Sequence, residues 1–286
     1  MALRAAWQMS GKFRLGLIIT GALVAVGLLH NVLIHLAIGD VSPHRVGSFG
    51  TFENASRSHW LGTDRYGRDV LGLVLAGLPI SLTVAAVAGV ISTLIGAIVG
   101  FVAGYKGGAV DATLRTITDM FLVIPTLPLI LILSAYVRDL STPKLALVLS
   151  VFSWPFAARV IRSQVLSLRE RPYIELSRMT DLSDRRIITE DILPNMLPFL
   201  GIGFAQSAVG AAFALVGLTI LGLGPSGVID LGTLISLGIA WGVLSLGKWP
   251  ILAAPIGLLV LLFLGFALIN LGLEEIYNPR LRGEAR

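Results

Sequence analysis

Long apolar stretches constrain this chain more than any other feature of its sequence. A helix that crosses the roughly 30 Å hydrocarbon core of a bilayer needs about 20 mostly apolar residues. Six stretches meet this requirement, at 15–38, 71–103, 112–137, 145–165, 196–223 and 251–273. Charged residues make up only 14% of the 286 residues, against about 25% in soluble domains. The sequence therefore predicts an all-α, polytopic membrane protein with six transmembrane helices.

The distribution of Lys and Arg predicts the orientation of these helices, because short flanks rich in both residues stay in the cytoplasm. The tail at 1–14 contains three basic residues and no acidic residue, and the segment 159–191 contains seven basic residues. By contrast, the segment 224–250 contains one acidic and one basic residue. We therefore expect both termini in the cytoplasm and the segment 224–250 outside.

These expectations divide the chain into five parts. They are a cytoplasmic tail at 1–14, a first transmembrane helix at 15–38, an extracytoplasmic segment at 39–70, a core of five transmembrane helices at 71–274, and a cytoplasmic tail at 275–286. A cleaved secretory signal is the alternative for the first stretch. Its apolar run is longer than the 7 to 15 residues typical of such signals, and no small-x-small site follows Ile38. We expect it to be retained.

Several kinds of chemistry lack the residues they require. The chain has no cysteine, which excludes disulfides, thiolate metal sites and a cysteine nucleophile. His30 and His35 do not have the four-residue spacing of a helical metal site. The sequence 242–248 has the G-x-x-x-x-G-K pattern, but Trp249 occupies the place of the Ser or Thr that would bind magnesium. We expect no cofactor, metal or catalytic residue on this chain.

Charged residues within the apolar stretches are few. Asp111, Arg115 and Asp119 fall four residues apart on one face of the third stretch, so that each acid can pair with the arginine between them. Asp119 would lie about 12 Å along the helix, where a charge requires a partner. A structural ion-pair ladder is one interpretation. A proton or ion relay is the other, and it would require further carboxylates or histidines at membrane depth.

The cytoplasmic segment 168–195 is patterned as two short amphipathic helices. Pro172 is placed to start the first, Ser183 can cap the second, and Pro194 can end it. The apolar side of the first helix consists of Tyr173, Ile174, Leu176 and Met179, beside Glu175 and Arg178. Such a pair of helices can serve as a lever for another protein or can lie on the membrane surface. The pattern alone leaves both alternatives open.

The string at 173–195 resembles the EAA loop of bacterial ABC importer permeases, and is closest to the second permease of the dipeptide and oligopeptide family. The resemblance continues, in order, through 59–64, 67–70, 103–108, 221–224 and 278–282. The motif before the second stretch contains Gly62, Asp64, Gly67, Arg68 and Asp69. The resemblance thus covers nearly the whole chain.

The resemblance implies a type I ABC importer permease in a prokaryotic inner membrane that forms half of a pathway for di- and oligopeptides. It implies four partners besides lipid: a homologous permease in a heterodimer, two cytoplasmic ABC ATPase subunits that bind ATP and Mg²⁺, and an extracytoplasmic solute-binding protein. Nucleic acid is not among them. The alternatives are import of oligosaccharides, glutathione or nickel chelates by the same class of transporter, a stand-alone secondary transporter, or an intramembrane enzyme.

In that family the EAA loop is the coupling helix that docks on the ATPase. The coupling residues carried over are Tyr173, Ile174, Glu175, Leu176, Ser177, Arg178, Met179 and Asp181. Glu175 matches the glutamate of the motif, whereas Asp181 stands where glycine is usual. The resemblance implies that Glu175 and Arg178 meet polar groups of the ATPase. The four apolar residues of the same helix, Tyr173, Ile174, Leu176 and Met179, would fill its groove.

Overall fold

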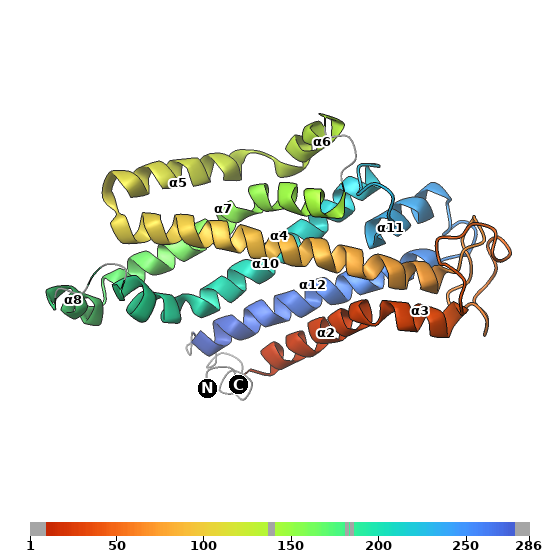
Figure 1. Cartoon of the computed structure of the whole chain (residues 1–286), viewed down its shortest axis with the longest axis horizontal. Coiled ribbons are helices and arrows are strands. Elements are labelled where there is room, and N and C mark those ends of the chain that lie inside the picture. Colours follow the sequence, from red (N-terminus) through yellow and green to blue (C-terminus); the bar gives the residue numbers. More distant parts are fainter. Residues whose placement is uncertain (1–9, 137–140, 181–182, 184–185, 278–286) are drawn as a thin grey trace.

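The computed structural model describes residues 10–136, 141–180, 183 and 186–277. These residues form an elongated bundle of long helices that run along one axis (Figure 1). The helices are α2 (Gly11–Leu28), α3 (His30–Ile38), α4 (Val70–Lys106), α5 (Gly108–Val123), α6 (Thr126–Tyr136), α7 (Thr142–Arg169), α8 (Pro172–Met179), the π-helical turn η1 (Ile187–Ile192), α10 (Leu193–Ile220), α11 (Leu231–Ala240) and α12 (Pro250–Tyr277). Helix α8 lies at one end of the bundle and the segment 40–69 at the other. We refer to these as the α8 end and the loop end.

Five helices of the described residues are long and apolar enough to cross a membrane. The pair of α5 and α6 is bent by 78° and makes a sixth span when the two helices are counted as one broken segment. Pro125 explains the bend, because it restricts the preceding residue to extended backbone and cannot donate a helical hydrogen bond. Ile124 has this extended conformation, with φ −70° and ψ 121°. The stretch expected at 112–137 is therefore two helices rather than one.

Helices α4 and α7 pack closely through a stripe of glycines. A Cβ atom added to Gly96 would lie 2.7 Å from the Cβ of Ala157, and one added to Gly100 would lie 2.7 Å from the carbonyl oxygen of Ala158. Gly104 meets Val165 in the same way, at 2.8 Å. Only glycine leaves room for this approach of two backbones in a membrane bundle. Helix α4 is consequently the central helix onto which α7 and α10 pack.

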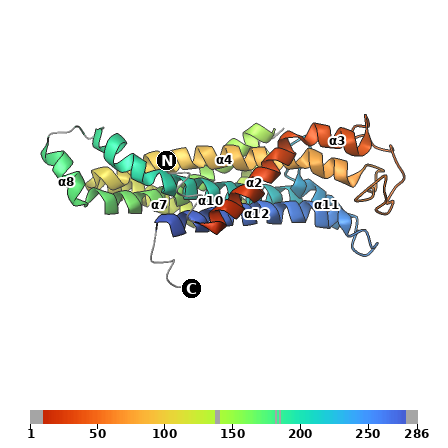
Figure 2. The same cartoon turned by 90° about the horizontal axis from the view of Figure 1, so that it is seen from below.

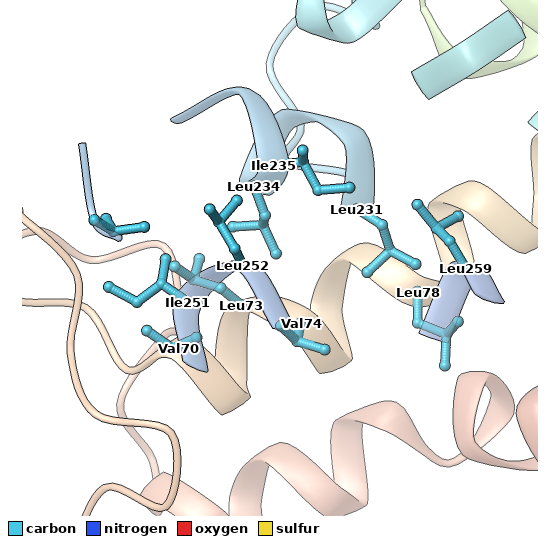
Figure 3. Packing of buried hydrophobic residues seen from close by; sticks show 11 residues of the cluster. Val70, Leu73, Val74, Leu78, Leu231, Leu234, Ile235, Ile251, Leu252 and Leu259 are labelled. Atoms are coloured by element: carbon cyan, nitrogen blue, oxygen red, sulfur yellow. The ribbon is translucent and has the colours of Figure 1, made fainter. Parts of the chain in front are cut away.

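Two apolar clusters hold the ends of the bundle together. At the loop end, residues of α4, α11 and α12 interdigitate (Figure 3). Its members include Leu73, Leu78, Leu234 and Leu252, so the short helix α11 is fixed between two spans. The second cluster, at the α8 end, joins α7, α8, η1 and α10. Helix α2 runs obliquely across the other long helices and packs on α12 (Figure 2).

Candidate functional site

Helix α8 is attached to the bundle through one buried side chain. Ile174 is fully buried and packs in the cluster that contains Val165, Ile187, Ile192 and Met196. This position differs from the expectation that Ile174 faces a groove of another protein. The reason is that η1 and the end of α7 pack against this side of α8. Ile174 is therefore an anchor of α8 within its own chain.

The other apolar residues of α8 point away from the bundle. The side chains of Tyr173, Leu176 and Met179 are 44%, 63% and 74% exposed, and Glu175 is also exposed. Residues three apart lie on the same face of a helix, so these three form one apolar ridge. We call Tyr173, Leu176 and Met179 the α8 ridge. The ridge therefore exposes three large apolar side chains side by side at the α8 end of the bundle.

A hydrogen bond fixes α8 against the π-helical turn. The hydroxyl of Ser177 donates to Oδ2 of Asp191 at 2.9 Å. Asp191 lies within the 173–195 string, but its contact with Ser177 was not predicted, because spacing along one helix does not indicate a contact between residues fourteen positions apart on two helices. Of the remaining predicted coupling residues, the side chain of Arg178 and the whole of Asp181 lie outside the described part of the structure. The structure thus places six of the eight predicted coupling side chains: five are exposed or half-buried and Ile174 is buried.

The two acidic residues of α5 pair with arginines of α7. The guanidinium of Arg162 on α7 donates two hydrogen bonds to the carboxylate of Asp111, from Nε to Oδ1 and from Nη2 to Oδ2, the second at 2.6 Å. Arg159 donates from Nη2 to Oδ1 of Asp119 at 2.6 Å, whereas Nε of Arg115 lies 3.6 Å from Oδ2 of Asp119. The expected partner of Asp111 was Arg115. The guanidinium of Arg162 binds it instead because α7 lies beside α5 and offers a bidentate geometry.

The predicted motif before α4 builds a compact loop. Asp64 accepts hydrogen bonds from the backbone N–H groups of Tyr66 and Arg68 at 2.8 and 3.0 Å, and its Oδ2 pairs with the Arg68 side chain at 2.6 to 2.7 Å. Both side chains are buried. Asp69 caps α4 by accepting from the N–H of Gly72 at 2.8 Å, and its other oxygen lies 2.8 Å from Nδ1 of His59.

The two glycines of this motif are required by the backbone. Gly62 and Gly67 have φ values of +77° and +65°, which side chains disfavour. A Cβ atom on Gly67 would also lie 2.2 Å from the carbonyl oxygen of Phe49. The loop contacts the end of α11 through Tyr66. The ring of Tyr66 packs edge-on against that of Trp241, with 5.5 Å between the ring centroids. All five motif residues therefore belong to one hydrogen-bonded loop, which we call the cap.

A buried carboxyl group starts helix α11 near this cap. Asp230 is fully buried and accepts hydrogen bonds from the N–H groups of Gly232 and Thr233 and from the Thr233 hydroxyl. Burial outweighs these bonds and raises the pKa of the Asp230 carboxyl above its ordinary value. The residue lies outside the membrane-spanning helices. Its protonation state therefore influences the stability of the loop end.

This raised pKa predicts a pH dependence of stability. A raised folded-state pKa contributes stability that is fully present below the unfolded pKa of about 3.9 and is lost as pH rises through the folded value. The Asp230→Asn variant keeps a side-chain cap for α11 but cannot ionise. We expect the melting temperature of the wild type, relative to that of Asp230→Asn, to fall between pH 4 and pH 8. A difference that stays constant over this range would contradict the assignment.

Within the described residues, no group of three or more His, Asp or Glu side chains is arranged to hold a metal ion. The described sites are thus an apolar ridge at one end, ion pairs between α5 and α7, and the cap at the other end.

The described residues thus form a bundle of membrane-spanning helices with a short exposed helix at one end and a structured loop at the other, which defines a multi-span membrane protein. The chain belongs to the family of binding-protein-dependent transport system inner membrane components, whose sequence profile matches residues 92–282. This membership confirms the predicted class of protein, and it makes the chain a transport subunit of the membrane.

Individual relatives agree with this assignment. The oligopeptide transport system permease protein OppC of Mycobacterium tuberculosis strain H37Rv is 37% identical over 232 residues, which cover 80% of this chain and 78% of the relative. The dipeptide transport system permease protein DppC of Bacillus subtilis is 32% identical over 289 residues, covering 97% and 85%.

A solved structure supports the fold. Inward-facing conformations of the MetNI methionine ABC transporter match with a TM-score of 0.55 and 22% identity, over 75% of this chain and 97% of that chain. Together with the family membership, this likeness confirms the predicted all-α permease fold.

Proposed function

We propose that this chain is a permease subunit of an ABC importer for di- and oligopeptides, and that it forms half of the pathway across the membrane. The observation that carries the proposal is the match to the dipeptide permease DppC, which extends over 97% of this chain. The match to the oligopeptide permease OppC points to the same class of substrate.

The α8 ridge supports a role in coupling. Its three apolar side chains are exposed on a helix that is anchored by Ile174 and tied to η1 by Ser177. A displacement of α8 would therefore also displace α7 and α10, because Ile174 shares a buried cluster with residues of both helices. In the proposed assembly, the ridge and Glu175 dock on a cytoplasmic ATPase subunit. ATP and Mg²⁺ bind to the ATPase subunits, and this chain performs no hydrolysis.

The orientation and the other partners follow from this role. The α8 end and both termini face the cytoplasm, in agreement with the excess of basic residues expected there. The cap at the loop end then faces outward, where it receives an extracytoplasmic solute-binding protein. A second, homologous permease supplies the other half of the pathway. The membrane is the inner membrane of a prokaryote.

Uptake by the assembled transporter tests the proposal. The complex with its partner subunits is reconstituted in proteoliposomes, and ATP-dependent uptake of a labelled tetrapeptide is measured. We expect an excess of unlabelled di- or tetrapeptide to abolish the uptake, and glutathione, a maltooligosaccharide or a nickel chelate to leave it unchanged. Failure to take up peptide, together with uptake of one of these other solutes, would refute the peptide assignment.

A further inference from the structure

A charged cavity lies between α4, α5 and α7 at the edge of the bundle. Its volume is about 470 Å³, and three of its nine lining residues are arginines, namely Arg115, Arg159 and Arg162. Among the described helices, α5 packs only against α4 and α7, and Figure 1 shows it at the upper edge of the bundle. The outer side of α5, beside the cavity, is therefore covered by no other described helix.

Positive charge exceeds negative charge around this cavity. The carboxylate of Asp111 accepts two hydrogen bonds from Arg162, and that of Asp119 accepts one from Arg159 at 2.6 Å. Each acid thus neutralises one arginine of α7. The third guanidinium belongs to Arg115, whose Nε lies 3.6 Å from Asp119, which is too far for a hydrogen bond. Three guanidinium groups face two carboxylates, and one positive charge is left over.

The guanidinium groups can be reached from outside the chain. The side chains of Arg115 and Arg159 are 65% and 59% exposed. A guanidinium has five N–H donors, so Arg159 keeps donors free after its bond to Asp119. The cavity has the volume of about fifteen molecules of liquid water, which is enough for a phosphate group and its substituents. The cavity therefore offers accessible donors to an acceptor that enters it.

The cavity lies near the depth of lipid headgroups. The apolar stretch of α7 ends near residue 165, so Arg162 and Arg159 lie about 5 and 9 Å before its end at 1.5 Å per residue. An arginine side chain is long enough to extend from this depth toward the headgroups. Ile98 and Met120, which adjoin lining residues in the sequence, are 66% and 60% exposed. A ligand here meets guanidinium groups and an apolar surface side by side.

We infer that this cavity binds the headgroup of an anionic phospholipid, whose phosphate oxygens accept hydrogen bonds from Arg115 and Arg159. Arginine matches the geometry of phosphate, and basic pockets between spanning helices suit anionic headgroups. An acidic side chain of a second permease would have to be buried at this depth, which is costly, whereas a lipid carries its charge there in any case. The inference goes beyond the proposed function, because it requires only that α5 and α7 lie in a membrane.

Lipid binding to the purified transporter, this chain with its partner subunits, tests the inference. The complex is stripped of lipid in a neutral detergent, and binding of phosphatidylglycerol and of zwitterionic phosphatidylcholine is measured by native mass spectrometry. Arg115→Gln removes the excess charge and leaves both pairs with α7 in place. We expect it to weaken the binding of phosphatidylglycerol at least about tenfold, as the loss of a charge-assisted hydrogen bond predicts. Binding of phosphatidylcholine should not change. Arg115→Lys keeps the charge and should retain more of the phosphatidylglycerol binding.

Arg14→Gln is the matched control. Arg14 is an exposed arginine in the first turn of α2, and Figure 1 shows α2 at the edge of the bundle opposite α5. This variant should bind phosphatidylglycerol as the wild type does, and both variants should melt at the wild-type temperature without lipid. Two results would overturn the inference. One is unchanged phosphatidylglycerol binding in Arg115→Gln, which means that the cavity is not the lipid site. The other is an equal loss in Arg14→Gln, which means that lipid responds only to overall charge.

Soluble anions distinguish a lipid headgroup from a free phosphate. A large excess of inorganic phosphate or glycerol phosphate should leave phosphatidylglycerol bound to the wild type, because neither anion brings acyl chains that can cover the apolar surface. Release of the lipid by either anion would identify a free anion as the ligand and would refute the lipid assignment. Because binding is measured without transport, a complex that imports no peptide would refute the proposed function and leave this site untouched.

Discussion

Replacing Leu176 and Met179 together by aspartate is expected to abolish peptide uptake while the bundle remains folded. Both side chains are largely exposed, so the folded chain loses little packing. In the proposed complex they lie in an apolar groove of the ATPase, where a carboxylate loses its water without gaining a partner. Buried interface anchors contribute about 2 kcal/mol or more each. The ATPase should therefore bind at least about thirtyfold more weakly.

Co-purification of the ATPase, peptide uptake and melting temperature measure the effect. A matched control is Leu244→Asp with Leu246→Asp, which makes the same change at two exposed leucines of the loop end. The control should keep the ATPase bound. Normal ATP-driven uptake by the Leu176 and Met179 variant, at normal expression, would exclude the α8 ridge as the coupling surface.

The same helix offers a contrasting position. Ile174→Ala removes a fully buried side chain from the cluster at the α8 end, and such truncations destabilise a protein by about 2 to 5 kcal/mol. A loss of uptake in this variant would come with a lower melting temperature. The ridge variant is expected to lose coupling without that loss of stability, which separates docking from packing.

The second large effect is expected from Asp64→Ala in the cap at the loop end. The substitution leaves the buried guanidinium of Arg68 without its carboxylate and removes the acceptor of two backbone N–H groups. Breaking a buried ion pair by removing one partner costs about 3 to 5 kcal/mol. We expect a marked decrease in melting temperature of the purified protein, with faster proteolysis in the segment 40–69.

Asp40→Ala is the control for this variant. Asp40 is an acid of the same segment, but its side chain is 97% exposed and its contact is with His35 at 3.1 Å. Exposed pairs contribute about 0 to 1 kcal/mol. Equal melting temperatures for Asp64→Ala and Asp40→Ala would show that the Asp64–Arg68 pair does not hold the cap.

The sequence predicted the spanning helices well because length and apolarity alone define them. The helices α4, α7, α10 and α12 each overlap a predicted stretch. The third stretch was harder, because its composition is continuous across Pro125 while the backbone turns by 78° there. The apolar composition of a stretch shows that its residues can lie in lipid, but it does not predict where the helix axis bends.

The candidate site was only partly predictable for a related reason. An amphipathic pattern identifies the apolar face of α8, but it does not say which residue of that face meets the chain itself. Ile174 is buried where α8 packs against η1 and α7, whereas Leu176 remains exposed. In the same way, four-residue spacing suggested Arg115 as the partner of Asp111. The actual partner, Arg162, became available only through the packing of α7 against α5.

The bend at Pro125 ties the direction of α6 to the packing of other helices. Its attachment to α5 passes through Ile124 and Pro125, and its Ile130 is fully buried in the cluster that contains Leu145, Leu149 and Leu215. Because α7 and α10 hold this side chain, α6 can change its direction only if that cluster rearranges. A substitution at Pro125 that straightened the chain would therefore also remove a side chain from the interior of the bundle.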